Sequence, residues 1–211
     1  MVLKIYGHPL STPSKLVAAI CYEKEVPFEF ITLDLLKGES RNPEHMARNP
    51  WGKVPVIDDD GFILYESRAI ARYIADKYAA KGPQLIPSDI HKRALLEQAI
   101  SSEAFTWDRA MLPILLEAVY KKYQGLESDP AKVEELTKTL CESLDVYEKI
   151  LAKQKYIAGD ELTIADFYFL PAGSGIQSVG INVLQERPNV ARWFNETSSR
   201  SSWQKASAIS A

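Results

Sequence analysis

The stretch that decides the fold is NPWGKVPVIDDDGFILYESRAIARYIADKY, residues 49–78. Two short apolar runs, Val54–Ile57 and Phe62–Leu64, have the composition of strands and are separated by the turn residues Asp58–Gly61. Apolar side chains then recur at helical spacing over Glu66–Tyr78. The stretch therefore predicts a β-hairpin followed by an amphipathic helix.

The residues before this stretch add two strands and a helix. Val2–Tyr6 is a predicted strand that Gly7–Pro9 ends. Apolar positions step by three and four residues over Pro13–Glu25, and proline suits the first helical position, where no backbone N–H is needed. Phe28–Leu33 is a further predicted strand. Residues 1–80 are thus expected to form an α/β domain in the order strand, helix, strand, loop, strand, strand, helix.

The rest of the chain is predicted to be helical. Residues 81–90, KGPQLIPSDI, contain two prolines and a glycine and are expected to link the first domain to an all-helical domain, residues 91–211. Leu95–Tyr123 is periodically apolar, although Pro113 should kink or break it. A second long amphipathic helix is predicted from Pro130.

Start signals mark two further helices. Thr163 and Asp166 have the spacing of a capping box. Pro188 precedes a short amphipathic segment, and the serine-rich tail from Ser198 is expected to fray. The expected fold class is therefore α/β plus all-α.

The composition excludes several classes of function. The 211 residues carry 25 Lys+Arg against 28 Asp+Glu, with no basic run to follow a phosphate backbone, so nucleic acid is not an expected partner. No apolar run is long enough for a signal peptide or a membrane span, so we expect a soluble, cytoplasmic protein that needs no membrane. Cys21 and Cys141 are far apart and are expected to be buried thiols, while His8, His45 and His91 lack metal-ligand spacing.

Six motifs resemble one family. The first three fall in order at the spacing of glutathione transferases: GHPLS at residues 7–11, NPWGKVPV at 49–56 and YESRAIARYIA at 65–75. The second half is similar to the same family in SLDVYEKIL (143–151), KYIAGDELTIADFYFLPA (155–172) and RPNVARWF (187–194). Over nearly its whole length the chain most closely resembles the phi class, which uses a catalytic serine. The resemblance implies a thioredoxin-like N-terminal domain (βαβ-ββα, mixed sheet), which binds glutathione, and a helical C-terminal domain that contributes the hydrophobic substrate site.

Three hydroxyl groups lie at the start of the first predicted helix, on Ser11, Thr12 and Ser14. Any of them could simply cap the helix. With Pro13 at the first helical position, Thr12 is the expected N-cap, which leaves Ser11 free to face a ligand. The resemblance implies that Ser11 is the catalytic serine, with Thr12 as the second choice. A hydroxyl that donates to the glutathione sulfur, next to a helix N-terminus, would favour the thiolate.

The resemblance also implies a glutathione site built from two segments. The Val54 backbone would pair with the cysteinyl part of glutathione as an added strand, Pro55 would be cis, and Lys53 could reach the glycyl carboxylate. At the helix start, Ser67 would donate to the γ-glutamyl carboxylate and Glu66 would pair with its ammonium group. An edge-strand proline, a solvated lysine and ordinary helix-start residues remain the alternatives.

One position departs from the family pattern. Where phi members commonly place a His-Lys pair for the glycyl carboxylate, this chain has Ser40 and Arg41. Arg41 carries the required charge, but its planar guanidinium differs from lysine in geometry. Arg41 is therefore expected to supply this contact.

The second substrate is expected in an apolar cleft between the two domains. Its predicted lining consists of Thr12, Leu35, Met111, Leu112, Leu115 and Leu116. Most of these side chains could equally be ordinary core. Leu35 and the segment 173–175 are smaller than the aromatic groups of many family members, so we expect a wide pocket for bulky electrophiles or other hydrophobic ligands.

Trp51 lies on the loop where related proteins present an apolar side chain to a partner subunit. An exposed tryptophan is a good interface anchor, so the sequence predicts a two-fold homodimer. A tryptophan packed into its own domain is the alternative.

The predicted function is transfer of glutathione, as co-substrate, to electrophilic hydrophobic small molecules, which is the chemistry of detoxification. No metal is implied. The same thiolate could reduce peroxides. A ligandin-like binding protein of the same fold, with little or no catalysis, is the alternative.

Overall fold

In the computed structural model, which describes residues 2–210, the chain folds as two compact units. The first contains the residues up to Leu85 together with the segment from Ser199, and the second is Ile86–Ser198. Among the described helices, none has the length and apolar character needed to cross a membrane.

The first unit is built on a four-stranded mixed sheet. Its strands, in the order β2-β1-β3-β4, are β1 (Leu3–Gly7), β2 (Phe28–Thr32), β3 (Val56–Asp59) and β4 (Phe62–Tyr65). β1 and β2 are parallel, whereas β3 is antiparallel to both β1 and β4. The predicted hairpin is confirmed, and its turn is closed by a 2.8 Å hydrogen bond from the Gly61 N–H to Asp58 Oδ1. This is the expected thioredoxin-like sheet.

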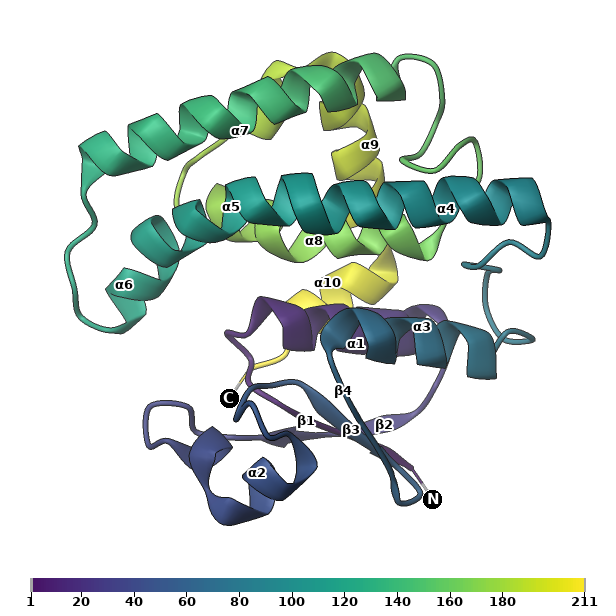
Figure 1. Cartoon of the computed structure of the whole chain (residues 1–211), viewed down its shortest axis with the longest axis vertical. Helices are drawn as coiled ribbons and strands as arrows, with labels where there is room; N and C mark the ends of the chain where they lie inside the picture. The colour runs from purple at the N-terminus through teal and green to yellow at the C-terminus, as the bar shows by residue number, and fades with distance from the viewer. Residues whose placement is uncertain (1, 211) are drawn as a thin grey trace. The chain divides into compact units, whose positions relative to one another are not determined.

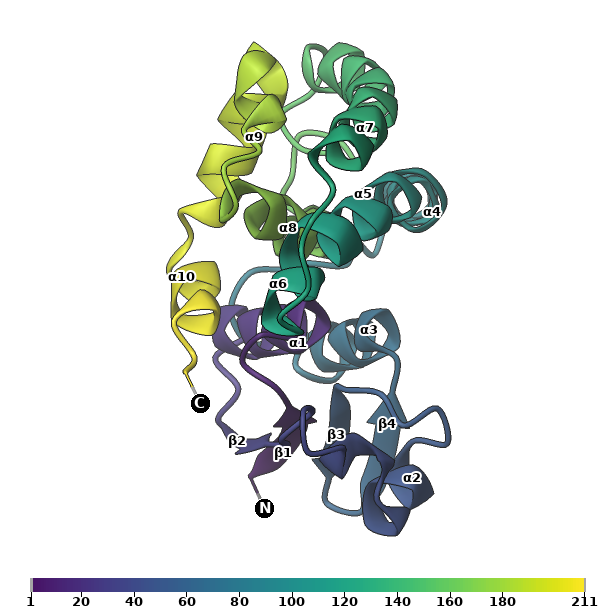
Figure 2. The same ribbon diagram turned by 90° about the vertical axis from the view of Figure 1, so that its left-hand side faces the viewer.

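Helices cover both faces of this sheet. Figures 1 and 2 show α1 (Thr12–Glu23) and α3 (Ser67–Lys77) side by side on one face, and α2 (Pro43–Arg48) on the other. A 3-10 turn, η1 (Glu39–Arg41), precedes α2. The sequence pattern predicted only a loop between β2 and β3, because a six-residue helix is too short to show a periodic pattern.

The C-terminal segment also belongs to the sheet unit. α10 (Ser201–Ser207) packs along α1, so the expectation of a frayed tail is wrong for these residues. Hydrogen bonds hold this segment in addition to the packing of the two helices. The buried Glu23 carboxylate accepts hydrogen bonds from the Arg200 guanidinium and the Ser202 hydroxyl.

The helical unit opens with one helical run that extends from residue 90 to residue 123. Its parts are α4 (Ile90–Ser102), η2 (Glu103–Trp107), α5 (Asp108–Ile114), η3 (Leu115–Tyr120) and α6 (Lys121–Tyr123). Pro113 lies inside α5 and does not break the run, contrary to one sequence expectation. The segments η2 and η3 on either side are π-helical, and π turns within a long helical run are a known cause of helix bending.

Three further helices complete this unit. α7 (Pro130–Leu151) confirms the long helix predicted from Pro130. After it come α8 (Ile164–Gln177), the 3-10 turn η4 (Val183–Glu186) and α9 (Pro188–Ser198). α8 is the central helix, because its side chains are buried around most of its circumference and it contacts α4, α5 and α9.

A buried carboxylate organises the start of α8. Asp166 accepts hydrogen bonds from the Thr163 N–H (2.8 Å), the Ile157 N–H (3.0 Å) and the Trp193 indole N–H (2.7 Å), and the predicted capping box is confirmed. Burial raises the pKa of Asp166, while these donors favour the charged carboxylate. The network joins α8, α9 and the loop before α8.

Replacing Asp166 with alanine should therefore destabilise the protein strongly. Asp166→Ala leaves buried donors without an acceptor, so we expect the free energy of unfolding to fall by about 3 kcal/mol. Urea unfolding followed by circular dichroism measures this loss. Glu134→Ala, at a position whose side chain is 72% exposed on α7, is the control and should change stability by less than about 0.5 kcal/mol. Similar small losses in both variants would contradict the role given to the network.

Candidate active site

The sheet register brings the predicted site segments to one edge of the sheet. This edge is the one at which β1, β2 and β4 end and β3 begins, and it runs across the strands. Tyr6 of β1 lies opposite Val56 of β3, and Val56 lies opposite Tyr65 of β4. β2 ends at the same edge, because it runs parallel to β1 with Gly7 opposite Thr32. The chain therefore leaves β1 toward Ser11, enters β3 from Lys53–Pro55, and leaves β4 toward Glu66 and Ser67, all at this edge.

Ser11 is the N-cap of α1, whereas the sequence predicted Thr12 at this position. The helix begins at Thr12, so Pro13 occupies its second position, where a backbone N–H is also unnecessary. The Ser11 hydroxyl accepts a 3.3 Å hydrogen bond from the Ser14 N–H. A hydroxyl has one proton to donate in addition to its acceptor lone pairs, so capping leaves the Ser11 proton available to a ligand.

Two hydrogen bonds to His8 hold the turn that carries Ser11. The Ser11 N–H donates to the His8 carbonyl (2.9 Å), and the Leu10 N–H donates to His8 Nδ1 (3.1 Å). One turn into α1, burial lowers the pKa of Lys15. Ser11 is half-buried, so its hydroxyl is fixed in place yet reachable.

The Val54–Pro55 peptide is cis, which confirms the sequence prediction. Val54 is half-buried, and within the part of the chain that the structure describes its N–H has no hydrogen-bond partner. Pro55 is buried next to the first residue of β3. The backbone of Val54 thus lies at the sheet edge with a donor available for an added strand.

Arg41 and Lys53 place two positive charges near this backbone. Both side chains are exposed. Their segments meet at Gly52, whose added Cβ would lie 3.5 Å from Arg41 Cγ and 3.1 Å from the Ser40 carbonyl. The geometry can attract a carboxylate to this end of the site.

Glu66 and Ser67 form the start of α3. Glu66 is the N-cap and has a positive φ of 71° with ψ 107°, a backbone conformation that is strained for a residue with a side chain and is typical of binding sites. The Ile70 N–H bonds to the Glu66 carbonyl, whereas the N–H groups of the first turn point out of the helix. Such an N-terminus binds an anion, and the exposed Glu66 carboxylate can bind a cation beside it.

The structure separates the predicted apolar residues into two groups. Met111 (0% exposed) and Leu115 (3% exposed) are core side chains of the helical unit and have almost no surface to offer a ligand. Leu112 and Leu116 remain exposed on the same helical run. In the sheet unit, Thr12 is half-buried and Leu35 is exposed near the edge at which β2 ends.

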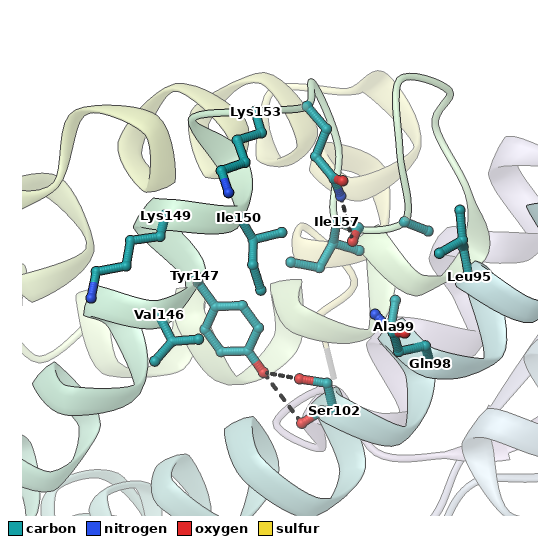
Figure 3. A pocket seen from close by; sticks show the side chains of 12 residues that line it. Leu95, Gln98, Ala99, Ser102, Val146, Tyr147, Lys149, Ile150, Lys153 and Ile157 are labelled. Atoms are coloured by element: carbon teal, nitrogen blue, oxygen red, sulfur yellow. Dashed lines mark hydrogen bonds between the residues drawn. The ribbon is translucent and has the colours of Figure 1, made fainter.

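The helical unit contains a groove of about 330 Å³ between α4 and the C-terminal half of α7. Figure 3 shows Leu95, Val146 and Ile150 around it, while Lys149 and Lys153 extend from the α7 side. At its base the Tyr147 hydroxyl lies 2.9 Å from Ser102 Oγ. Burial raises the pKa of Tyr147 to about 12, so this phenol stays neutral in the groove.

The two cysteines differ in their surroundings. Cys21 is fully buried in α1, and burial raises the pKa of its thiol far above the ordinary value, so it is an inert core side chain. Cys141 was also expected to be buried, but it is only half-buried at the surface of α7. Among residues 2–210, no group of three His, Cys, Asp or Glu side chains is placed to hold a metal ion.

Two residues of the site, His45 and Asn49, were not predicted from the sequence. Both side chains are buried and contact the Lys53 carbonyl. From the sequence, His45 was considered only as a metal ligand, for which its spacing is unsuitable. The available signal was Asn42-Pro43, an N-cap residue followed by proline, which marks the start of α2.

Comparisons with known proteins all indicate one family, and the similarity extends over nearly the whole chain. The family model for the glutathione S-transferase N-terminal domain matches residues 1–76, and that for the C-terminal domain matches residues 102–201. Glutathione S-transferase hmp2 of Hypomyces subiculosus is 42% identical and covers 99% of each chain. Among solved structures, glutathione transferase F7 from Populus trichocarpa has a TM-score of 0.93 at 33% identity, covering 97% of each chain. Glutathione S-transferase I from mais, in complex with an atrazine glutathione conjugate, has a TM-score of 0.91 at 31% identity, covering 99% of this chain and 97% of that chain.

Replacing Gly52 with any residue that has a side chain should destabilise the protein. Its φ is +60°, and an added Cβ would lie 2.9 Å from Met46 Sδ. We expect Gly52→Ala to lower the free energy of unfolding by about 2–3 kcal/mol, as left-handed strain and crowding add. Gly38→Ala is the matched control, because Gly38 has φ +75° but open space, and it should cost only about 1 kcal/mol. Thermal unfolding distinguishes them, and equal losses would show that close packing does not constrain Gly52.

Proposed function

Because this chain belongs to the glutathione S-transferase family, in its phi class, we propose that it joins the glutathione thiolate to electrophiles with the Ser11 hydroxyl as the group that stabilises the sulfur. The observation that supports this role is the hydrogen bond from the Ser14 N–H to Ser11 Oγ. It fixes the serine oxygen as an acceptor toward the helix and directs its single proton elsewhere.

The chemistry needs a thiolate at neutral pH. A cysteine thiol has a pKa of about 8.5, so free glutathione is mostly protonated. Ser11 can donate its proton to the sulfur, and this hydrogen bond favours the charged form. The N-terminus of the 12-residue α1 adds a positive dipole end at the same place. Accepting the Ser14 N–H also polarises the hydroxyl and strengthens it as a donor.

The other predicted residues suit the rest of glutathione. The Val54 backbone is available to pair with the cysteinyl unit at the sheet edge. Ser67 and the N-terminus of α3 can hold the γ-glutamyl carboxylate, with Glu66 on the ammonium group. Arg41 and Lys53 can hold the glycyl carboxylate. The whole tripeptide would then lie along one edge of the sheet.

The second substrate is a hydrophobic electrophile. Thr12 and Leu35 have accessible surface in the sheet unit and are proposed to contact it next to the sulfur. In the conjugation step the thiolate forms a bond to an electrophilic carbon, and for an aryl halide the halide leaves with the bonding electron pair. Reduction of peroxides by the same thiolate, and a cytoplasmic location, stay predictions.

Ser11→Ala should lower kcat/KM for conjugation to an aryl halide by roughly 10- to 150-fold near pH 7. This range corresponds to losing a hydrogen bond to a charged group, about 1.5–3 kcal/mol. The deficit should shrink as pH rises above about 8.5, because the thiol then ionises without help. Steady-state kinetics over this pH range test the expectation.

Two variants control for the cap. Ser11→Gly also lacks the hydroxyl but costs a helix start only a few tenths of a kcal/mol, so it should match Ser11→Ala in activity and exceed it in thermal stability. Thr12→Ala should keep most of the activity. If Thr12→Ala loses conjugation while Ser11→Ala keeps it, Thr12 is the donor. A wild-type protein that neither binds nor conjugates glutathione would leave the ligandin-like alternative.

We also propose a two-fold homodimer in which Trp51 of each copy enters the α4–α7 groove of the other. Trp51 is 65% exposed. The backbone N–H of Trp51 donates to Asn49 Oδ1 at 3.1 Å, so the loop that presents the indole is fixed. The groove is lined mainly by apolar side chains, including the exposed Leu95 and Val146. A two-fold arrangement uses both contacts twice.

Trp51→Ala should raise the dimer dissociation constant by at least about 30-fold, because a buried tryptophan anchor contributes 2 kcal/mol or more. Val146→Asp, within the groove, should weaken the dimer similarly by burying a charge. Leu36→Ala is the control, since Leu36 is 83% exposed in the same unit as Trp51. Sedimentation equilibrium measures all four proteins. A monomeric wild type, or a dimer unaffected by Trp51→Ala, would contradict the proposal.

A further inference from the structure

The Lys53 carbonyl oxygen accepts hydrogen bonds from two buried side chains. His45 Nε2 lies 2.9 Å from it and Asn49 Nδ2 lies 2.8 Å from it. His45 is 1% exposed and Asn49 is 3% exposed, so water does not compete for these bonds. Both lone pairs of one loop carbonyl are therefore used by the protein.

The two donors are themselves fixed. The backbone N–H of His45 donates to Oδ1 of the N-cap residue Asn42 at 2.7 Å, and the backbone N–H of Asn49 donates to the His45 carbonyl at 2.8 Å. On the other side, Asn49 Oδ1 accepts from the Trp51 N–H, and the Gly52 N–H donates to the Asn49 carbonyl at 2.9 Å. α2 and the turn after it thus act as a rigid holder for Lys53.

The histidine is held as a donor through one nitrogen. A carbonyl can only accept, so His45 Nε2 carries the proton. His45 Nδ1 is buried and has no hydrogen-bond partner among the described residues. The ring therefore has a single polar contact within the described chain, and that contact is the Lys53 carbonyl.

The consequence of this contact falls on the next residue. The Lys53–Val54 peptide is planar and trans, so its N–H points opposite to its C=O. Two bonds on the Lys53 oxygen hold the carbonyl toward α2, and the Val54 N–H must then point away from α2, where it has no partner within the described chain. A rotation of this peptide would break both bonds and turn the N–H away from its present direction.

We propose that His45 and Asn49 are positioning residues for glutathione: they orient the Lys53–Val54 peptide so that the Val54 N–H meets the cysteinyl carbonyl of the tripeptide. The inference rests on the proposed function of the site. Neither side chain touches glutathione in this account. Their effect is on binding, because the contact is made to the peptide backbone of glutathione and is present equally before and during reaction at sulfur.

The test compares apolar and conservative variants at both positions. His45→Leu and Asn49→Leu should each raise KM for glutathione about three- to tenfold, the loss expected from one hydrogen bond, with kcat within about twofold. KM for the aryl halide should not change. His45→Gln can still donate from its amide and should restore KM for glutathione to within about twofold of wild type. Glu44→Ala, on the exposed side of α2, is the matched control and should leave both KM values unchanged.

Other results would overturn the inference. It fails if KM for glutathione is unchanged in His45→Leu and Asn49→Leu, or if kcat falls while KM stays constant. It also fails if His45→Gln behaves like His45→Leu, because a structural role of the ring would then explain both. If the leucine variants do not fold, as judged by circular dichroism, Asn49→Asp and His45→Gln are compared: Asn49→Asp, which lacks the donor, must raise KM and His45→Gln must not. A wild type that fails to bind glutathione would instead contradict the proposed function, which separates the two failures.

Discussion

The site depends on the register of one central strand. β3 lies between β1 and β4 and is antiparallel to both, so its first residue, Val56, lies between Tyr6 and Tyr65. Strand side chains alternate between faces, and a slip of one residue would reverse every side chain of β3. Val56 and Ile57 are fully buried, which fixes the register by burial of apolar surface. Ser11, Val54 and Glu66 share one edge of the sheet because this register is fixed.

Two hydrogen-bonded arrangements then prepare that edge for a ligand. At Ser11, the bond from the Ser14 N–H serves helix α1 and leaves the hydroxyl proton for the sulfur. At Lys53, the bonds from His45 and Asn49 hold the carbonyl inward and leave the Val54 N–H for the peptide. In both places a donor meets a ligand because the protein has already used the neighbouring acceptor. Such preorganisation lowers the cost of ordering on binding.

The sequence predicted the parts of this structure that local chemistry controls. The turn Asp58–Gly61, the capping box at Thr163 and the helix from Pro130 all carry residues with a direct backbone preference. The start of α1 was misplaced by one residue because proline is tolerated at either of the first two positions. Met111 and Leu115 could not be told from Leu112 and Leu116, since the side that faces the core is set by packing against α7 and α8. The role of His45 depends on a contact across a turn that no local pattern specifies.

The most direct measurement is the ionisation of bound glutathione, followed by the ultraviolet absorbance of the thiolate as pH is varied. In the wild-type complex the account predicts a thiol pKa well below the free value of about 8.5. In the Ser11→Ala complex the pKa should return toward that value, while saturation with glutathione ensures that the same species is compared. An unshifted pKa in the wild-type complex, or an equal shift in both complexes, would contradict the claim that Ser11 stabilises the thiolate.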